Sequence, residues 1–302
     1  MTRHRPSLCR LNKRRIHDVS TVSPSTGGIA KSNVAHRVSN AASWLAERGV
    51  EAPVGAIVLG SGWAPLVERV DVSDQWPYSD IPGLPSCSVK GHPGDLVYGR
   101  WGGVPLVVFV GRWHAYEGRE PGELALQPLL ARALGAHWML GTNAAGGIDS
   151  NLRVGDLVAV TDDLSFWATG RAIRMNGVST AASNRGAPYS PRLVDALVHA
   201  AGETGIPLHR GTLAMMTGAN YESAAEIAML RFAGASVVSM STLPEVRTAR
   251  AIGLEAAALS CVTNKVPSAF YERLEHDHVL GVLERTRGHA ERLIETWLQM
   301  VT

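Results

Sequence analysis

The sequence predicts an α/β protein, a three-layer α/β/α sandwich around a mixed, mostly parallel twisted sheet. From residue 33 onward, apolar runs of strand length alternate with helical patterns, and this alternation is typical of a sheet covered by helices. The apolar runs are continuous rather than interrupted by polar residues, as expected for strands that are buried on both faces. Polar or glycine-rich residues follow the ends of these runs.

The first predicted element is a helix at residues 33–49, "NVAHRVSNAASWLAERG", whose apolar side chains recur on one face and which ends at Gly49. Strands are predicted at residues 56–62, 104–110, 137–145, 156–161, 211–217, 236–242 and 254–263. Helices are predicted at residues 124–135, 190–205, 223–234, 244–252 and 276–300. The sequence contains no internal repeat, so residues 33–302 are expected to form a single domain.

Residues 1–32 are expected to be a basic, disordered extension. The first 30 residues carry a net charge of +5, which leaves −3 for the rest of the chain, and they lack hydrophobic periodicity. A twin-arginine export signal needs an apolar stretch after Arg14 and Arg15, and none follows. Contact with nucleic acid is the alternative for such a basic segment, but the composition favours a solvated extension.

Composition predicts a soluble cytoplasmic protein without a metal site. The chain has 302 residues, 45% of them hydrophobic, enough for a large core. No apolar run approaches the roughly 20 residues that a membrane helix needs. The three cysteines, Cys9, Cys87 and Cys261, have no metal-ligand spacing and are expected to be reduced thiols. No histidines or carboxylates fall at a recognisable ligand spacing either.

Polar clusters close six of the predicted strands. They are Ser61, the stretch from Arg112 to Glu117, "TNAAGG" at 142–147, "GANYE" at 218–222, Met240 with Ser241, and Thr263 with Asn264. In open α/β sheets, ligands bind beyond the carboxyl ends of the strands. Alone, "GSG" at 60–62 or "GRWHAYEG" at 111–118 fits a polar turn as well as a binding loop, but six clusters in the same relative place predict a site.

The residue types in these clusters fit two kinds of ligand group. Arginine and histidine donors with serine hydroxyls and a backbone amide can encircle inorganic phosphate, as Ser61, Arg112, His114, Ser241 and an amide near Ala144 would do. Acceptor and amide groups, such as Glu222 and Asn264, can read the edge of a purine. Met240 and the ring of Tyr116 could line a sugar.

The chain resembles the trimeric purine nucleoside phosphorylases. Seven segments carry the resemblance, in the order and approximate spacing of that family: "LGSGW" (59–63), "GHPGDLVYG" (91–99), "GRWHAYEG" (111–118), "GTNAAGG" (141–147), "GANYES" (218–223), "VSMSTLPEV" (238–246) and "VTNK" (262–265). The resemblance implies a phosphorylase/hydrolase-like fold and a cytoplasmic homotrimer of purine salvage. It implies no cofactor, with inorganic phosphate as co-substrate, and neither membrane nor nucleic acid as partner.

The implied reaction is the phosphate-dependent cleavage of 6-oxopurine ribo- or deoxyribonucleosides to free base and α-pentose 1-phosphate. The resemblance assigns the catalytic roles to His114, Glu222 and Asn264. It implies phosphate contacts by Ser61, His92, Arg112, His114, Ala144 and Ser241. It implies ribose contacts by Tyr116, Met240 and His276, and purine contacts by Ala145, Gly146, Tyr221, Glu222, Thr263 and Asn264. Glu117 is expected to orient a neighbour such as His92 or Arg112.

The chain departs from the family pattern at several places. Ala219 stands where the family usually has proline, and Ser239 stands where it has glycine, so the sugar contacts are expected to differ. Residues 164–189 keep almost none of the expected loop, which in the family sends an aromatic side chain over the ribose of a neighbouring subunit. For the contact to the ribose 5′-hydroxyl, the motif favours His276, whereas ungapped counting favours His278.

Other functions stay open at the level of sequence. A related methylthioadenosine phosphorylase is disfavoured, because a 6-aminopurine requires a carboxylate near Asn264 to accept its amino hydrogen. The sequence is also compatible with a specialised nucleoside enzyme of secondary metabolism and with a catalytically silent nucleoside sensor.

Overall fold

The computed structural model describes residues 28–89, 92–166, 174–175, 178–179, 188–266 and 276–302. Of residues 28–33, 174–175, 178–179 and 276–278 it describes only the backbone. The basic extension therefore lies outside the described residues up to position 27, as does most of the divergent segment 164–189. The first helix, α1 (Gly28–Ala46), begins five residues before the helix expected from the sequence.

A nine-stranded mixed sheet forms the centre of the molecule, in the order β10-β9-β6-β11-β5-β1-β4-β3-β2. β10 also pairs with β5, so β5, β11, β6, β9 and β10 close into a ring. The strands are β1 (Gly55–Leu59), β2 (Val70–Pro77), β3 (Asp95–Trp101), β4 (Val104–Val110), β5 (Trp138–Gly147), β6 (Leu157–Ser165), β9 (Leu208–Met215), β10 (Val237–Ser239) and β11 (Glu255–Lys265). A separate two-stranded sheet joins β7 (Arg174–Met175) and β8 (Val178–Ser179).

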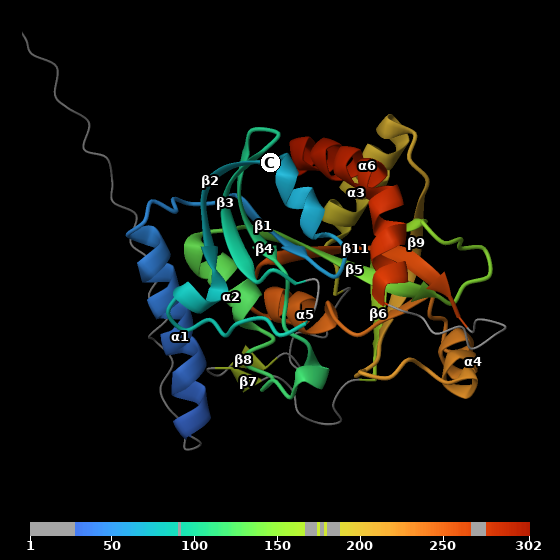
Figure 1. Ribbon diagram of the computed structural model, residues 1–302, viewed down its shortest axis with the longest axis horizontal. Coiled ribbons are helices and arrows are strands. Elements are labelled where there is room, and N and C mark those ends of the chain that lie inside the picture. The colour runs from blue at the N-terminus through green and yellow to red at the C-terminus, as the bar shows by residue number, and fades with distance from the viewer. Residues whose placement is uncertain (1–27, 90–91, 167–173, 176–177, 180–187, 267–275) are drawn as a thin grey trace, which may run out of the picture.

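Helices cover both faces of the sheet, which confirms the predicted α/β/α class. α3 (Pro191–Thr204) packs against α6 (His276–Val301) on one side, and α2 (Leu126–Leu134) packs against α1 and α5 (Leu243–Ala251) on the other (Figure 1). α4 (Ala224–Phe232) stands near β9 at one end of the molecule (Figure 1). No helix in the described part of the chain is long and apolar enough to cross a membrane.

The apolar runs that predicted the strands form the core. All five residues of β1 are buried, and burying each large aliphatic side chain contributes about 1.5–3 kcal/mol. Trp138 at the start of β5 packs edge-on against Trp297 of α6, with ring centroids 4.9 Å apart. Trp297 also donates a hydrogen bond to the Leu193 carbonyl of α3 (3.0 Å), so one side chain ties α6 to both the sheet and its neighbouring helix.

The strand directions bring the predicted polar clusters together. β4 and β11 run parallel to β1 and β5, so their carboxyl ends meet at one edge. β10 runs antiparallel to β5, and pairs with it only at Gly146 and Gly147. The chain leaving β10 therefore travels back toward the middle of β5 and reaches the same place from the opposite direction.

Candidate active site

A cavity of about 150 Å³ lies where these strand ends meet. Twelve of the residues predicted for the site line it: Ser61, His114, Tyr116, Ala144, Ala145, Gly146, Tyr221, Glu222, Met240, Ser241, Thr263 and Asn264. Two more, His92 and Arg112, touch lining residues from behind the wall. The side chains of His276 and His278 lie outside the described residues.

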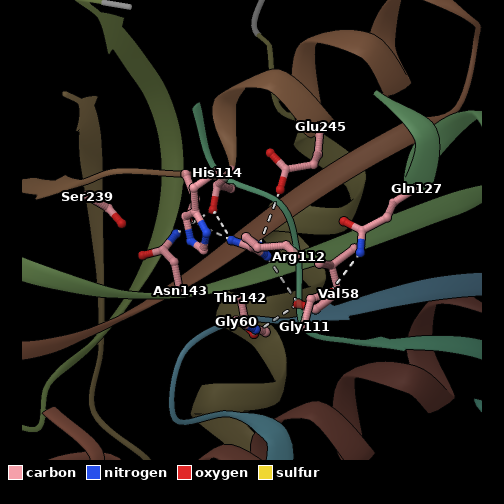
Figure 2. Close-up of polar contacts among 12 residues, drawn as sticks. Val58, Gly60, Gly111, Arg112, His114, Gln127, Thr142, Asn143, Ser239 and Glu245 are labelled. Atoms are coloured by element: carbon pink, nitrogen blue, oxygen red, sulfur yellow. Dashed lines mark hydrogen bonds and ion pairs between the residues drawn. The ribbon is translucent and has the colours of Figure 1, made fainter. Parts of the chain in front are cut away.

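Arg112 lies buried directly behind Ser241. Its Nη1 donates to the Ser241 hydroxyl and to the Thr242 hydroxyl, both at 2.9 Å, and its Nε lies 3.3 Å from the Glu245 carboxylate (Figure 2). The guanidinium is 1% exposed. Burial lowers the pKa of Arg112, whereas the charge of Glu245 raises it. Since arginine keeps its proton in proteins, the site contains a buried positive charge one hydrogen bond away from the cavity.

His92 contacts Ser61 from behind the cavity wall, as Arg112 contacts Ser241. The backbone N–H of Arg112 donates to His92 Nδ1 (2.9 Å), so the neutral ring carries its proton on Nε2. Nε2 lies 2.8 Å from the Ser61 hydroxyl and donates to it. Gly111 makes this approach feasible, because its φ is +109° and a β-carbon there would lie 2.9 Å from His92 Cβ.

Ser61 and Ser241 are therefore prepared to bind an anion. Each hydroxyl oxygen accepts a hydrogen bond from a donor behind the wall, His92 or Arg112. A serine hydroxyl has one hydrogen to donate, and in both residues this hydrogen stays available on the cavity side. Two such donors, one backed by His92 and one by the Arg112 guanidinium, favour an oxyanion beside these serines.

Glu117 holds His114. Its Oε1 accepts the His114 backbone N–H (2.6 Å) and lies 3.3 Å from His114 Nδ1, while the Ser88 hydroxyl donates to its other oxygen. Burial raises the pKa of Glu117, but these hydrogen bonds from His114 and Ser88 outweigh it and lower the pKa to about 2. Glu117 was expected to orient a neighbour such as His92 or Arg112. The neighbour that it contacts is His114, three residues away on the same short turn.

The lowered pKa of Glu117 predicts an acid-sensitive contribution to stability. The carboxylate stabilises the fold at neutral pH, and this contribution should be lost as the pH falls from about 4.5 toward about 2. We expect Glu117→Gln to lower the urea midpoint at pH 7 and to lower it much less at pH 2.5, where part of the carboxylate is already protonated in the folded protein. Equal losses at both pH values in urea titrations would contradict this assignment.

Glu222 and Asn264 also line the cavity. Burial raises the pKa of Glu222 above its usual value. Asn264 follows a β-bulge in β11, where the register with β5 shifts between Val262 and Asn264, and such bulges re-aim side chains. The Thr263 hydroxyl donates to Asn264 Oδ1 (3.2 Å). A carboxylate and a carboxamide thus face one cavity.

Tyr116 and Met240, which both line the cavity, also both approach Gly218. A β-carbon on Gly218, whose φ is +72°, would lie 2.5 Å from Met240 Sδ and 2.9 Å from Tyr116 Cδ1. The Tyr116 ring stacks on His114 with centroids 4.8 Å apart. Ser239, the serine in place of a family glycine, turns its hydroxyl to β5 and donates to the Ala144 carbonyl (2.9 Å).

Several supporting residues were missed by the sequence reasoning. Gln127 of α2 donates to the Gly111 carbonyl (2.8 Å), and Tyr78 donates to the same oxygen (2.9 Å). Asn143 donates to the Thr242 hydroxyl (2.9 Å). Gln127 interrupts the apolar face of its helix, which was an available signal, whereas nothing local in the sequence distinguishes Tyr78. Asn143 and Thr242 lie inside two of the family motifs, where no role was assigned to them.

Among the described residues, no group of three or more histidine, cysteine, aspartate or glutamate side chains is placed to hold a metal ion.

Comparisons with known proteins agree with this geometry. Residues 55–299 match the family model of the phosphorylase superfamily. The chain is 33% identical over 260 residues to purine nucleoside phosphorylase 1 of Geobacillus stearothermophilus, covering 85% of this chain and 95% of that protein. It is 37% identical over 251 residues to purine nucleoside phosphorylase of Mycobacterium tuberculosis, covering 82% of this chain and 90% of that one.

Solved structures give the same result. The purine nucleoside phosphorylase of Schistosoma mansoni in complex with adenosine superposes with a TM-score of 0.76 at 29% identity, covering 87% of this chain and 96% of that chain. Isoform 2 from the same organism, in complex with cytosine and ribose-1-phosphate, superposes with a TM-score of 0.77 at 29% identity, covering 87% and 95%. The chain therefore belongs to the phosphorylase superfamily, and within it to the purine nucleoside phosphorylases.

Proposed function

We propose that the protein cleaves the N-glycosidic bond of 6-oxopurine ribo- and deoxyribonucleosides with inorganic phosphate, releasing the free base and α-pentose 1-phosphate. One observation carries this proposal: a single cavity is lined both by two backed serine hydroxyls, Ser61 and Ser241, and by Glu222 with Asn264. The first pair suits a phosphate and the second suits a purine edge. The sugar between them would join the two ligands.

At the phosphate end, Ser61, Ser241 and the Ala144 amide donate to the phosphate oxygens. His92 and Arg112 act behind the two serines, and the Arg112 charge attracts the anion through Ser241. His114, whose Nδ1 faces Glu117, uses Nε2 for the phosphate or the sugar. These groups hold one phosphate oxygen toward C1′ of the bound nucleoside.

At the base end, Glu222 accepts hydrogen bonds from N1–H and the 2-amino group, and Asn264 engages N7 and O6. Ala145, Gly146, Tyr221 and Thr263 enclose the ring. As the bond from C1′ to N9 breaks, its electron pair moves onto the purine, and Asn264 stabilises the negative charge that develops there. A phosphate oxygen then bonds to C1′ as hydrogen phosphate gives up its proton, and the base leaves after taking up one proton, so that the protons balance.

The acceleration comes mainly from positioning and electrostatics. The sugar passes through an oxocarbenium-like transition state, so a phosphate anion held against C1′ stabilises it. Holding two reactants in place supplies up to about 7–11 kcal/mol of the barrier. This chemistry uses no cofactor beyond phosphate as co-substrate. Tyr116, Met240 and His276 contact the ribose, and the active form is a cytoplasmic homotrimer.

Glu222 supplies a pH test of the base assignment. Because burial raises the pKa of Glu222, the carboxylate is protonated, and stops accepting from N1–H, at a higher pH than an exposed glutamate would. We expect kcat/KM for inosine to fall as the pH drops through this raised pKa. Glu222→Gln should lower kcat/KM at pH 7 by about 10- to 100-fold and remove this acid limb.

Glu226 is the matched control for that substitution. It lies four residues further on and is exposed, and it caps α4 by contacting Ser223. Glu226→Gln should keep the wild-type pH profile for inosine. If Glu222→Gln also kept the wild-type acid limb, Glu222 would not be the base-reading carboxylate.

The proposed function is tested by incubating the protein with inosine, guanosine, adenosine and methylthioadenosine, with and without phosphate, and following base release. We expect turnover of inosine and guanosine only in the presence of phosphate. Preference for methylthioadenosine would favour the related phosphorylase instead. Binding of inosine without any turnover would favour a sensor.

A further inference from the structure

Glu245 is a buried carboxylate that the proposed mechanism does not use. It lies in the first turn of α5 and is 4% exposed. Its Oε1 is 3.3 Å from Arg112 Nε, yet neither atom finds a hydrogen-bond partner among the described residues. The contact is therefore one of charge rather than of an aligned hydrogen bond. Figure 2 shows the carboxylate reaching from α5 to the guanidinium.

The position of Arg112 does not depend on Glu245. The Nη1 group is held by the Ser241 and Thr242 hydroxyls at 2.9 Å, and Nη2 lies 3.5 Å from the Val58 carbonyl. The Arg112 backbone N–H is bound to His92. Removing the charge of Glu245 would thus leave the guanidinium in place, and the effect would be electrostatic.

The turn before α5 is built to hold this arrangement. Thr242 has a φ of +82°, which is unfavourable for a side chain with a branched β-carbon, and it is fully buried. Such strain costs about 1–3 kcal/mol and persists only where the surroundings enforce it. Here the Thr242 hydroxyl accepts from both Arg112 and Asn143, so the turn places Ser241 and Glu245 around one guanidinium.

We propose that Glu245 is the internal counter-ion of Arg112, which neutralises the guanidinium when the cavity holds no phosphate and weakens phosphate binding when it does. This inference rests on the proposed function, because it assumes that phosphate binds at Ser61 and Ser241. A bound phosphate and the Glu245 carboxylate share one positive charge. Because like charges repel across the buried site, the negative charge of Glu245 lowers the affinity of the site for phosphate.

Removing the charge of Glu245 is expected to raise the affinity of the site for inorganic phosphate. Glu245→Gln keeps the shape of the side chain and removes its charge, so inorganic phosphate should bind about three- to tenfold more tightly. The phosphate-free protein should melt at a lower temperature, because Arg112 is left buried without a counter-charge. The rise in melting temperature on adding phosphate should therefore exceed that of the wild type. A purely structural role would weaken phosphate binding instead.

The experiment measures inorganic phosphate binding by calorimetry, the melting temperature with and without phosphate, and the KM for inosine. Glu245→Asp keeps the charge and should bind phosphate within about twofold of the wild type. Glu255→Gln removes a carboxylate of the exposed pair with Arg192 and should leave phosphate binding unchanged. The KM for inosine should stay near the wild-type value in all three variants.

The outcomes separate this inference from the proposed function. Tighter phosphate binding in Glu245→Gln, or a larger phosphate-dependent rise in its melting temperature, supports the counter-ion. Unchanged or weaker phosphate binding in this variant, with normal binding by the wild type, overturns it. A wild-type protein that binds no phosphate would overturn the proposed function itself. If a variant is too unstable for calorimetry, the difference between its melting temperatures with and without phosphate still reports phosphate binding.

Discussion

Arg112→Met is expected to abolish phosphate-dependent turnover and to destabilise the fold. The substitution removes the guanidinium that donates a hydrogen bond to Ser241. It also leaves the Glu245 carboxylate buried without its positively charged partner. Breaking a buried ion pair in this way costs about 3–5 kcal/mol of unfolding free energy. We expect kcat/KM to fall by at least about 10³-fold, comparable to the loss of a strong transition-state donor.

The matched control is Arg192→Met. Arg192 also pairs with a glutamate, Glu255 at 2.7 Å, but that pair is largely exposed, and exposed pairs contribute about 0–1 kcal/mol. Urea unfolding should therefore separate the two variants by several kcal/mol, and kcat/KM should change only in Arg112→Met. Wild-type phosphate kinetics in Arg112→Met would remove this side chain from the site.

Asn264→Ala is expected to slow the release of the purine base without changing the affinity for phosphate. Asn264 faces the cavity after the β-bulge of β11 and is held by the Thr263 hydroxyl. If its amide stabilises the charge that develops on the leaving purine, its loss should lower kcat by about 10²- to 10³-fold. Calorimetry should find the same phosphate affinity as in the wild type, because the proposed phosphate donors are Ser61, Ser241 and the Ala144 amide rather than Asn264.

The matched control is Asn151→Ala. Asn151 is an exposed asparagine that follows β5, and its substitution should leave kcat unchanged. Thr263→Val tests how Asn264 is held, since it removes the hydroxyl that donates to Asn264 Oδ1. An intermediate loss of kcat is expected there. An Asn264→Ala protein with the kcat of the wild type would show that the purine leaves without help from this amide.

Much of the fold could be predicted from the sequence because its central strands are buried on both faces. β1 and β4 are continuous apolar runs, and β5 and β11 contain apolar stretches that lead into polar residues toward their carboxyl ends. Such stretches stand out against the helical periods between them. β2 was missed because five consecutive residues of this edge strand, 71–75, are exposed. Its sequence therefore has no apolar run to detect. The closure of the ring through β10 could not be predicted either, since it depends on pairing between distant segments.

The candidate site was predictable for the groups that face the cavity. Residues such as His114 and Asn264 follow apolar runs, and the family motifs name them directly. Behind the wall, the family motifs name His92 and Arg112, but the supporting roles of Gln127, Tyr78 and Glu245 were not predictable, because they come from burial and from partners far away in the sequence. Glu245 is the clearest case: a glutamate in a first helical turn usually faces solvent, and only the fold brings it to Arg112. The hydroxyl direction of Ser239 likewise depends on β5 lying beside β10.

The most direct test of phosphorolysis is to follow inosine and inorganic phosphate together by phosphorus NMR while measuring hypoxanthine release. The proposed reaction consumes one phosphate for each base released, and one sugar 1-phosphate signal appears in its place. Hypoxanthine release with the phosphate signal unchanged would mean hydrolysis rather than phosphorolysis. An absence of both changes at saturating inosine and phosphate would contradict the proposed activity altogether.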